Sequence, residues 1–253
     1  MITFTDTQVV AWLAPILWPF LRTLALFGTL PVFGQRPVPA RIRVALAFLI
    51  ALAAQAVLPP MPAIALDSAA MFGAVAQQVL IGVSLGFAVR IVFAAVGFAG
   101  ELVGLQMGLN FAAFFDPMSG SESTSVARFF DTTVAFLFVI VNAHLLVIAA
   151  VVQSFQAFPV GDEPFAFLRQ VHPYVWGTEV FRLGLWIALP LVAMLLFVNL
   201  VLGVISRVAQ QMNIYAVGFP ITIGVGLVGV LLTLPAMQQP FTIALERMLG
   251  YFR

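Results

Sequence analysis

The chain has 253 residues, of which 62% are hydrophobic and only 8% are charged, with a formal net charge of +1. A soluble domain has about a quarter of its residues charged, so this composition excludes a water-facing globule and indicates a protein that faces lipid or other apolar protein. The small net charge gives no reason to expect nucleic-acid binding, and the absence of cysteine excludes disulfides and thiolate sites.

Long apolar runs follow one another along the chain. A helix needs about 20 apolar residues to cross the bilayer core, and helices satisfy their own backbone in lipid. We therefore expect an all-α integral membrane protein with about six hydrophobic helical segments. The runs are 7–33, 44–66, 68–89, 132–161, 183–206 and 208–245. Apolar character continues beyond the third run to Phe115, which predicts a long or broken helix there.

The loop between the first two runs is rich in arginine. It holds Arg36, Arg41 and Arg43, and loops with excess Arg lie on the cytoplasmic side. The pattern predicts an N-terminus outside the cytoplasm, and six passes would return the C-terminus to the same side.

Three prolines, Pro190, Pro220 and Pro235, lie inside apolar runs. Proline removes a backbone donor and kinks a helix, and within a membrane the freed carbonyl needs a neighbouring partner. We expect kinked helices that are bundled together as hairpins.

Glycines recur at helical spacing in the third segment, at Gly97, Gly100, Gly104 and Gly108. Small residues at this spacing allow two helices to approach closely. The stripe fits packing within the chain as well as packing on another subunit, and the sequence leaves both open.

Charged residues at membrane depth are candidate functional groups by default. Arg22, Arg90, Glu101, Arg128 and Asp131 are the candidates here. His144 and His172 belong to no motif, and a lone His144 in an apolar run is more typical of packing than of a proton relay. Because carboxylates are few and histidines scattered, we expect no metal or other cofactor. Since phosphate loops and nucleophile elbows are missing as well, we expect no enzyme.

The segment QMGLNFAAFFDPMSGSES, residues 106–123, is the most unusual feature of the chain. Asp116-Pro117 ends the helical pattern, because proline disfavours helix in the residue before it, and small polar residues follow. Apolar side chains that narrow a wet path block ions, so the segment fits a plug or gate. The alternative is a surface loop whose phenylalanines pack on the bundle. The apolar members of the segment are Met107, Phe111, Phe114, Phe115 and Met118.

A polar turn separates the last two long runs. Gln210, Gln211 and Asn213 follow Arg207 there. These amides fit either a cap of the turn or a contact with a partner chain.

Three motifs in this order resemble the FliR family, the flagellar type III export gate proteins, which are related to the SctT proteins of virulence secretion. They are LPVFGQRPVPARIRVALA (30–47), GLQMGLNFAAFFDP (104–117) and RVAQQMNIYAVGFPITIGVG (207–226). The resemblance covers nearly the whole chain. It implies one membrane domain with a FliP-like part, residues 1–180, and a FliQ-like helical hairpin, residues 181–253.

The resemblance also implies a function. Family members form a channel with FliP and FliQ in the bacterial inner membrane, at the flagellar basal body, with FlhB and FlhA as further partners. Their cargo is unfolded flagellar protein. The plug or gate would comprise Met107, Asn110, Phe111, Phe114, Phe115, Asp116, Pro117 and Met118. The cytoplasmic entrance and partner contact would comprise Arg36, Arg41, Arg43, Arg207, Gln210, Gln211 and Asn213.

A second class of function is compatible with the same prolines. A secondary transporter would place a broken-helix binding site near Pro190 or Pro220. Uptake of a small solute by the chain alone would favour the transporter, whereas co-purification with two smaller membrane proteins would favour the export gate.

Overall fold

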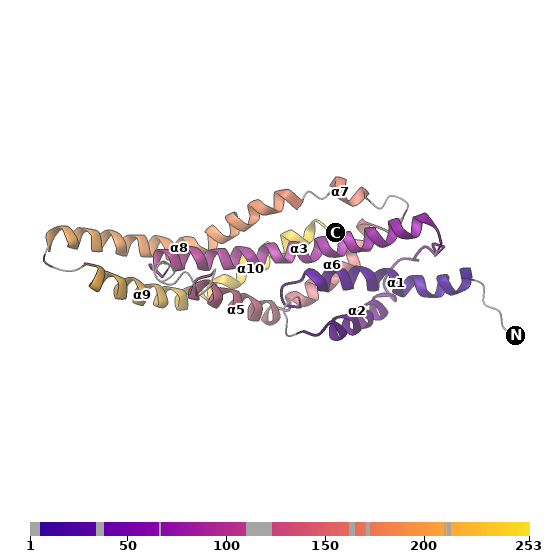
Figure 1. Ribbon diagram of the computed structural model, residues 1–253, viewed down its shortest axis with the longest axis horizontal. Coiled ribbons are helices and arrows are strands. Elements are labelled where there is room, and N and C mark those ends of the chain that lie inside the picture. Colours follow the sequence, from indigo (N-terminus) through magenta and orange to yellow (C-terminus); the bar gives the residue numbers. More distant parts are fainter. Residues whose placement is uncertain are drawn as a thin grey trace. The chain divides into compact units, whose positions relative to one another are not determined.

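The computed structural model describes residues 6–33, 38–65, 67–109, 123–161, 165–170, 173–209, 211 and 214–253. Within these ranges every regular element is helical (Figure 1), which confirms the predicted all-α class. The elements are α1 (Asp6–Thr29), α2 (Ala40–Ala54), α3 (Ala69–Gln106), α5 (Ser125–Ile140), α6 (Ala143–Ala157), α7 (Ala166–Gln170), α8 (Pro173–Val208), α9 (Ile214–Thr233), the 3-10 helix η2 (Pro235–Met237) and α10 (Gln238–Gly250).

Four helices in the described part are long and apolar enough to cross a membrane, or five if α5 and α6 are one broken span. The four are Val10–Thr29, Ala69–Gln106, Tyr174–Val208 and Ala216–Thr233. Each of the predicted apolar runs contains helix, but α2 has only 15 residues and ends before Pro59. The orientation of the chain in the membrane stays a prediction.

The third apolar segment forms one uninterrupted helix of 38 residues that passes both Arg90 and Glu101. Its C-terminus is a Schellman motif around Gly108, whose φ is +79°. The Leu109 N–H donates to the Gly104 carbonyl at 3.1 Å, and the Gly108 N–H donates to the Leu105 carbonyl at 3.0 Å. Glycine is favoured at this position because a Cβ strains the left-handed conformation.

Within the described residues, only some of the prolines lie at a helix break. α8 continues through Pro190 and α9 through Pro220, whereas Pro235 begins η2. The break between α5 and α6 contains no proline. It falls at Asn142, which adopts the left-handed conformation with φ 55°.

The chain divides into two compact units. The first unit comprises Met1–Ile91, Asn142–Trp176 and Leu245–Arg253, and the second comprises Val92–Val141 and Gly177–Ala244. These units are defined by packing alone. They do not test the FliP-like and FliQ-like parts that the resemblance implies, and those parts stay a prediction.

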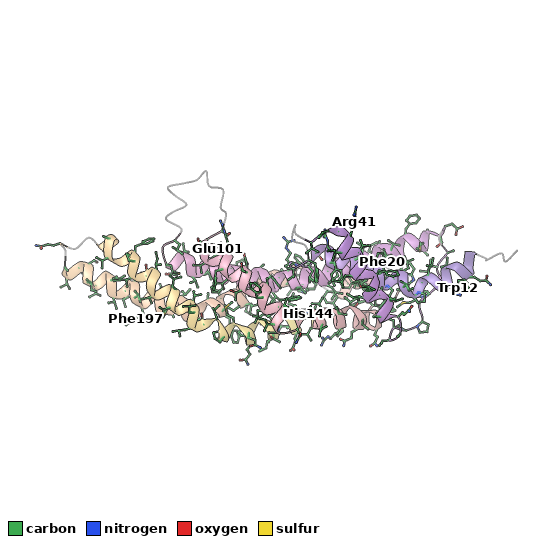
Figure 2. All side chains as sticks on the ribbon, turned by 90° about the horizontal axis from the view of Figure 1, so that it is seen from below. Trp12, Phe20, Arg41, Glu101, His144 and Phe197 are labelled. Carbon is green, nitrogen blue, oxygen red and sulfur yellow. The ribbon has the colours of Figure 1, made fainter. Side chains whose placement is uncertain are left out.

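In the first unit, α1 packs against α2 and α6 (Figure 1). Phe20 of α1 meets Phe48 of α2 edge to face, with 6.5 Å between ring centroids (Figure 2 labels Phe20). α1 also lies close to α3, since a Cβ added at Gly82 would lie 2.8 Å from the Ala25 Cβ. A second aromatic cluster joins Phe158, Phe167, Trp176 and Phe252, with centroids 5.0 to 5.8 Å apart.

In the second unit, α8 and α9 run side by side (Figure 1), and Gly229 of α9 lies against Met194 of α8. Many large apolar side chains of α8 point outward, among them Trp186 and Phe197 (Figure 2 labels Phe197). An apolar exterior of this kind is expected of a membrane helix that faces lipid or other subunits.

Candidate functional site

The glycine stripe of α3 packs on α5 inside the second unit. A Cβ added at Gly100 would lie 2.7 Å from the Ala127 Cα, and one at Gly104 would lie 2.7 Å from the Thr124 Oγ1. At Gly97 the nearest atom would be the Asp131 Oδ1, at 2.6 Å. For these three glycines the structure shows packing within the chain. A Cβ added at Gly108 would instead lie 3.3 Å from the ring of Phe219 of α9.

The start of α5 is tied to α3 by hydrogen bonds as well as by close packing. Thr124 is the N-cap of α5, and its hydroxyl oxygen accepts from the Ala127 N–H at 3.1 Å. The Thr124 N–H donates to the Glu101 Oε1 at 3.0 Å. Glu101 lies on the last part of α3 (Figure 2), so this bond joins two helices directly at the end of the predicted plug segment.

The other end of that segment is anchored on α9. Met107 is fully buried, and a Cβ added at Gly226 would lie 2.6 to 2.8 Å from its side-chain atoms. The Thr222 hydroxyl lies 3.4 Å from the Met107 carbonyl and donates more closely, at 3.0 Å, to the Phe219 carbonyl. The predicted plug residue Met107 is therefore part of the contact between α3 and α9.

These contacts define the loop base, by which we mean Glu101, Gly104, Met107, Gly108 and Thr124. Gly104 is central to it, because its carbonyl accepts from Leu109 and its α-carbon faces Thr124. The remaining predicted plug positions, Asn110, Phe111, Phe114, Phe115, Asp116, Pro117 and Met118, lie outside the described residues.

The predicted cytoplasmic entrance is described in part. Arg41 on α2 is exposed (Figure 2), and Arg43 is half-buried. Arg207, in the last turn of α8, and Gln211 are exposed. Arg36, Gln210 and Asn213 lie outside the described residues.

Arg22 of α1 is the charged residue with the least exposure in the described part of the chain, at 0%. Its Nε donates to the Gln78 Oε1 at 2.8 Å, Nη1 to the Ser154 Oγ at 2.8 Å, and Nη2 to the Phe158 carbonyl at 3.0 Å. Its guanidinium also lies 3.5 Å from the centroid of the Phe155 ring. Every one of these partners is neutral, and together they join α1, α3 and the end of α6.

The other charges that the sequence singled out are less enclosed. Arg90, Arg128 and Asp131 are exposed, and His144 on α6 is half-buried (Figure 2). Among the described residues no group of three His, Cys, Asp or Glu side chains could hold a metal ion. Arg22 and Glu101 stand out in the sequence as charges at membrane depth, but their partners lie 23 to 136 positions away and are brought to them only by the fold.

Fold and composition together define an integral membrane protein built from helices, in which the end of α3 is hydrogen-bonded to the start of α5. The family model described as bacterial export proteins, family 1, matches residues 13–248. The chain therefore belongs to this family of bacterial export proteins. Its relatives include FliR proteins, so the resemblance of the three motifs to the FliR family is confirmed.

Three relatives cover almost the whole chain. The chain is 42% identical over 244 residues to the flagellar biosynthetic protein FliR of Pectobacterium carotovorum subsp. carotovorum, and 41% identical over 244 residues to that of Escherichia coli (strain K12). Each alignment covers 95% of this chain and 92% of the relative. The FliR protein of Bacillus subtilis (strain 168) is 31% identical over 240 residues, which cover 90% of this chain and 91% of the relative.

Proposed function

We propose that this chain is a channel-forming subunit of the flagellar type III protein export gate. It passes unfolded flagellar proteins across the bacterial inner membrane, and a plug closes the resting pore. The plug residues are Met107, Asn110, Phe111, Phe114, Phe115, Asp116, Pro117 and Met118. Membership in the export family and the identity of the relatives as flagellar biosynthetic proteins support a role in flagellar export.

The loop base carries the plug part of the proposal. Met107 and Gly108 lie against α9, and Thr124 lies against α3 through Glu101 and Gly104. The phenylalanines at 111, 114 and 115 supply the apolar bulk that excludes water and ions.

The partners follow from the exterior of the chain. The apolar faces of α8 and α9 need lipid or neighbouring subunits, and we propose FliP and FliQ as those neighbours. FlhB and FlhA would meet the cytoplasmic side, near Arg41, Arg43, Arg207 and Gln211. We propose that this chain has no enzymatic activity. The energy for transport must then come from other components of the export apparatus.

An ion-leak experiment tests the plug. The triple variant Phe111→Ala, Phe114→Ala, Phe115→Ala should raise ion conductance through the assembled complex more than it lowers secretion, because bulk at the constriction is lost. The matched control replaces the same three residues with leucine, which keeps apolar volume, and should leak much less. Assembly is checked by co-purification with FliP and FliQ, and unchanged conductance in a correctly assembled alanine variant would contradict the plug.

A further inference from the structure

A groove lies on the surface of the second unit, between α8 and the segment that holds η2 and the start of α10. Leu185, Trp186 and Leu189 of α8 line one side of it, and Ala236 of η2 lines the other. Its volume is about 600 Å³, which lies within the range of sites that hold small ligands. Most of the described side chains that line it are apolar, so a ligand that fills it must be mainly hydrocarbon.

A pair of opposite charges stands at one end of this groove. Arg182 lines the groove, and its Nη2 donates to the Glu179 Oε2 at 2.8 Å, three positions earlier on α8. The Arg182 side chain is 56% exposed, and a guanidinium has five N–H donors, so it can bind a second anion beside the carboxylate. Because the two charges cancel, the pair suits a ligand group that itself carries one charge of each sign.

The charge pair lies at the edge of the apolar part of α8. Residues 183–206 contain no charged side chain, and about 20 apolar residues cross the hydrocarbon core as a helix. This places Arg182 at the level of the lipid headgroups, and Trp186, one turn further along, in the interfacial zone where tryptophan is enriched. The groove then runs from the headgroups into the hydrocarbon layer.

We propose that this groove is a binding site for one phospholipid with an ethanolamine headgroup. An acyl chain lies along Leu185 and Leu189, the phosphate accepts hydrogen bonds from Arg182, and the headgroup ammonium donates to Glu179. A choline headgroup has no N–H to donate, and a glycerol headgroup brings no positive charge to Glu179. Hydrogen bonds between ionised groups are the strong ones, so the headgroup determines which lipid is selected. The site goes beyond the proposed function and needs neither the pore nor its plug.

The selection can be measured by native mass spectrometry of the chain, purified in mild detergent with the subunits that accompany it. Phospholipids with ethanolamine, glycerol and choline headgroups and identical acyl chains are added in equal amounts. The unmodified protein should bind one ethanolamine lipid about tenfold more tightly than either of the others. Arg182→Gln should abolish this preference. The matched control Arg90→Gln, which changes an exposed arginine of α3, should keep it.

Two further variants separate the headgroup contact from the groove. Glu179→Gln should weaken binding of the ethanolamine lipid and strengthen binding of the glycerol lipid, because the negative charge beside the headgroup is gone. Ala236→Phe should weaken binding of all three lipids, because its ring fills the groove. Ala236→Ser keeps the groove open and should bind as the unmodified protein does.

Equal binding of the three lipids by the unmodified protein would overturn the proposal, since only unselective surrounding lipid would remain. Equal effects of Arg182→Gln and Arg90→Gln would overturn it as well. So would an unmodified protein that binds no lipid while Ala236→Phe loses a companion subunit, because a protein would then cover the groove. If Ala236→Phe fails to fold, the exposed position Arg182 still decides. Because lipid binding is measured without ion conductance, a phenylalanine variant that does not leak would overturn the plug and leave this site standing.

Discussion

The two units of the chain hold their helices together in different ways. In the first unit the guanidinium of Arg22 is fully buried. It donates three hydrogen bonds to neutral groups and lies against the ring of Phe155. In the second unit the helices α3 and α5 meet through glycines, with backbones so close that a single added carbon at Gly100 would collide with Ala127.

The two kinds of contact determine different properties of the helix packing. The guanidinium has donors in a rigid planar fork, so Arg22 fixes the directions from which α1, α3 and the end of α6 approach. A glycine contact has no direction of its own and fixes only how near two helices come. Between α3 and α5, direction comes from the hydrogen bond that the Thr124 N–H donates to Glu101.

The largest effect is expected from removing the guanidinium. Arg22→Met leaves the Gln78, Ser154 and Phe158 acceptors without their donor, and unsatisfied buried groups cost about 1–3 kcal/mol each. We expect a loss of about 4 kcal/mol in the free energy of unfolding, measured by denaturation in detergent and followed by tryptophan fluorescence. Arg22→Lys should recover only part of it, because an ammonium cannot reproduce the fork.

The exposed arginine of α2 is the control for this change. Arg41→Met should alter stability by less than about 0.5 kcal/mol, as is usual for a surface position. Equal effects of Arg22→Met and Arg41→Met on stability would show that the hydrogen bonds of Arg22 do not stabilise the first unit.

An intermediate effect is expected at the glycine contact of the second unit. Gly100→Ala places a methyl group 2.7 Å from the Ala127 backbone and should cost about 1–3 kcal/mol by overpacking. Gly203→Ala on α8 meets nothing within 4 Å and should raise stability by up to about 1 kcal/mol, because alanine favours helix over glycine. The opposite signs are the test, and thermal denaturation of both variants in one detergent measures them.

The smallest effect is expected at the end of α3. Gly108→Ala forces a Cβ into a left-handed conformation with φ +79°, which costs about 1–2 kcal/mol. Gly108→Asn should cost less, because asparagine tolerates this conformation better. Melting temperatures of the pair check the ranking, and an alanine variant as stable as the parent would show that the Schellman motif is not needed to end the helix.

Much of the fold could be predicted because it depends on local chemistry. Apolar runs predicted the helices, and glycine spacing identified the stripe on α3. The apolar pattern past Arg90 and Glu101 left a long helix and a broken helix open, and the structure has one helix of 38 residues. The break at Asn142 could not be predicted, since it lies within an uninterrupted apolar run and depends on one residue in a left-handed conformation.

The contacts of the candidate site depended on the tertiary structure. Glu101 was singled out as a charge at membrane depth, but nothing in its neighbours indicates that it accepts from Thr124. Likewise, Gln78 and Ser154 lie in ordinary apolar surroundings in the sequence, and only the fold brings them to Arg22.

The length of α3 has a consequence for where the protein sits in the bilayer. A straight helix of 38 residues measures about 57 Å at 1.5 Å per residue, whereas the hydrocarbon layer is about 30 Å thick. Tilts in the usual range of up to about 40° cannot accommodate that excess. Part of α3 must therefore project beyond the lipid tails into water or a protein sheath.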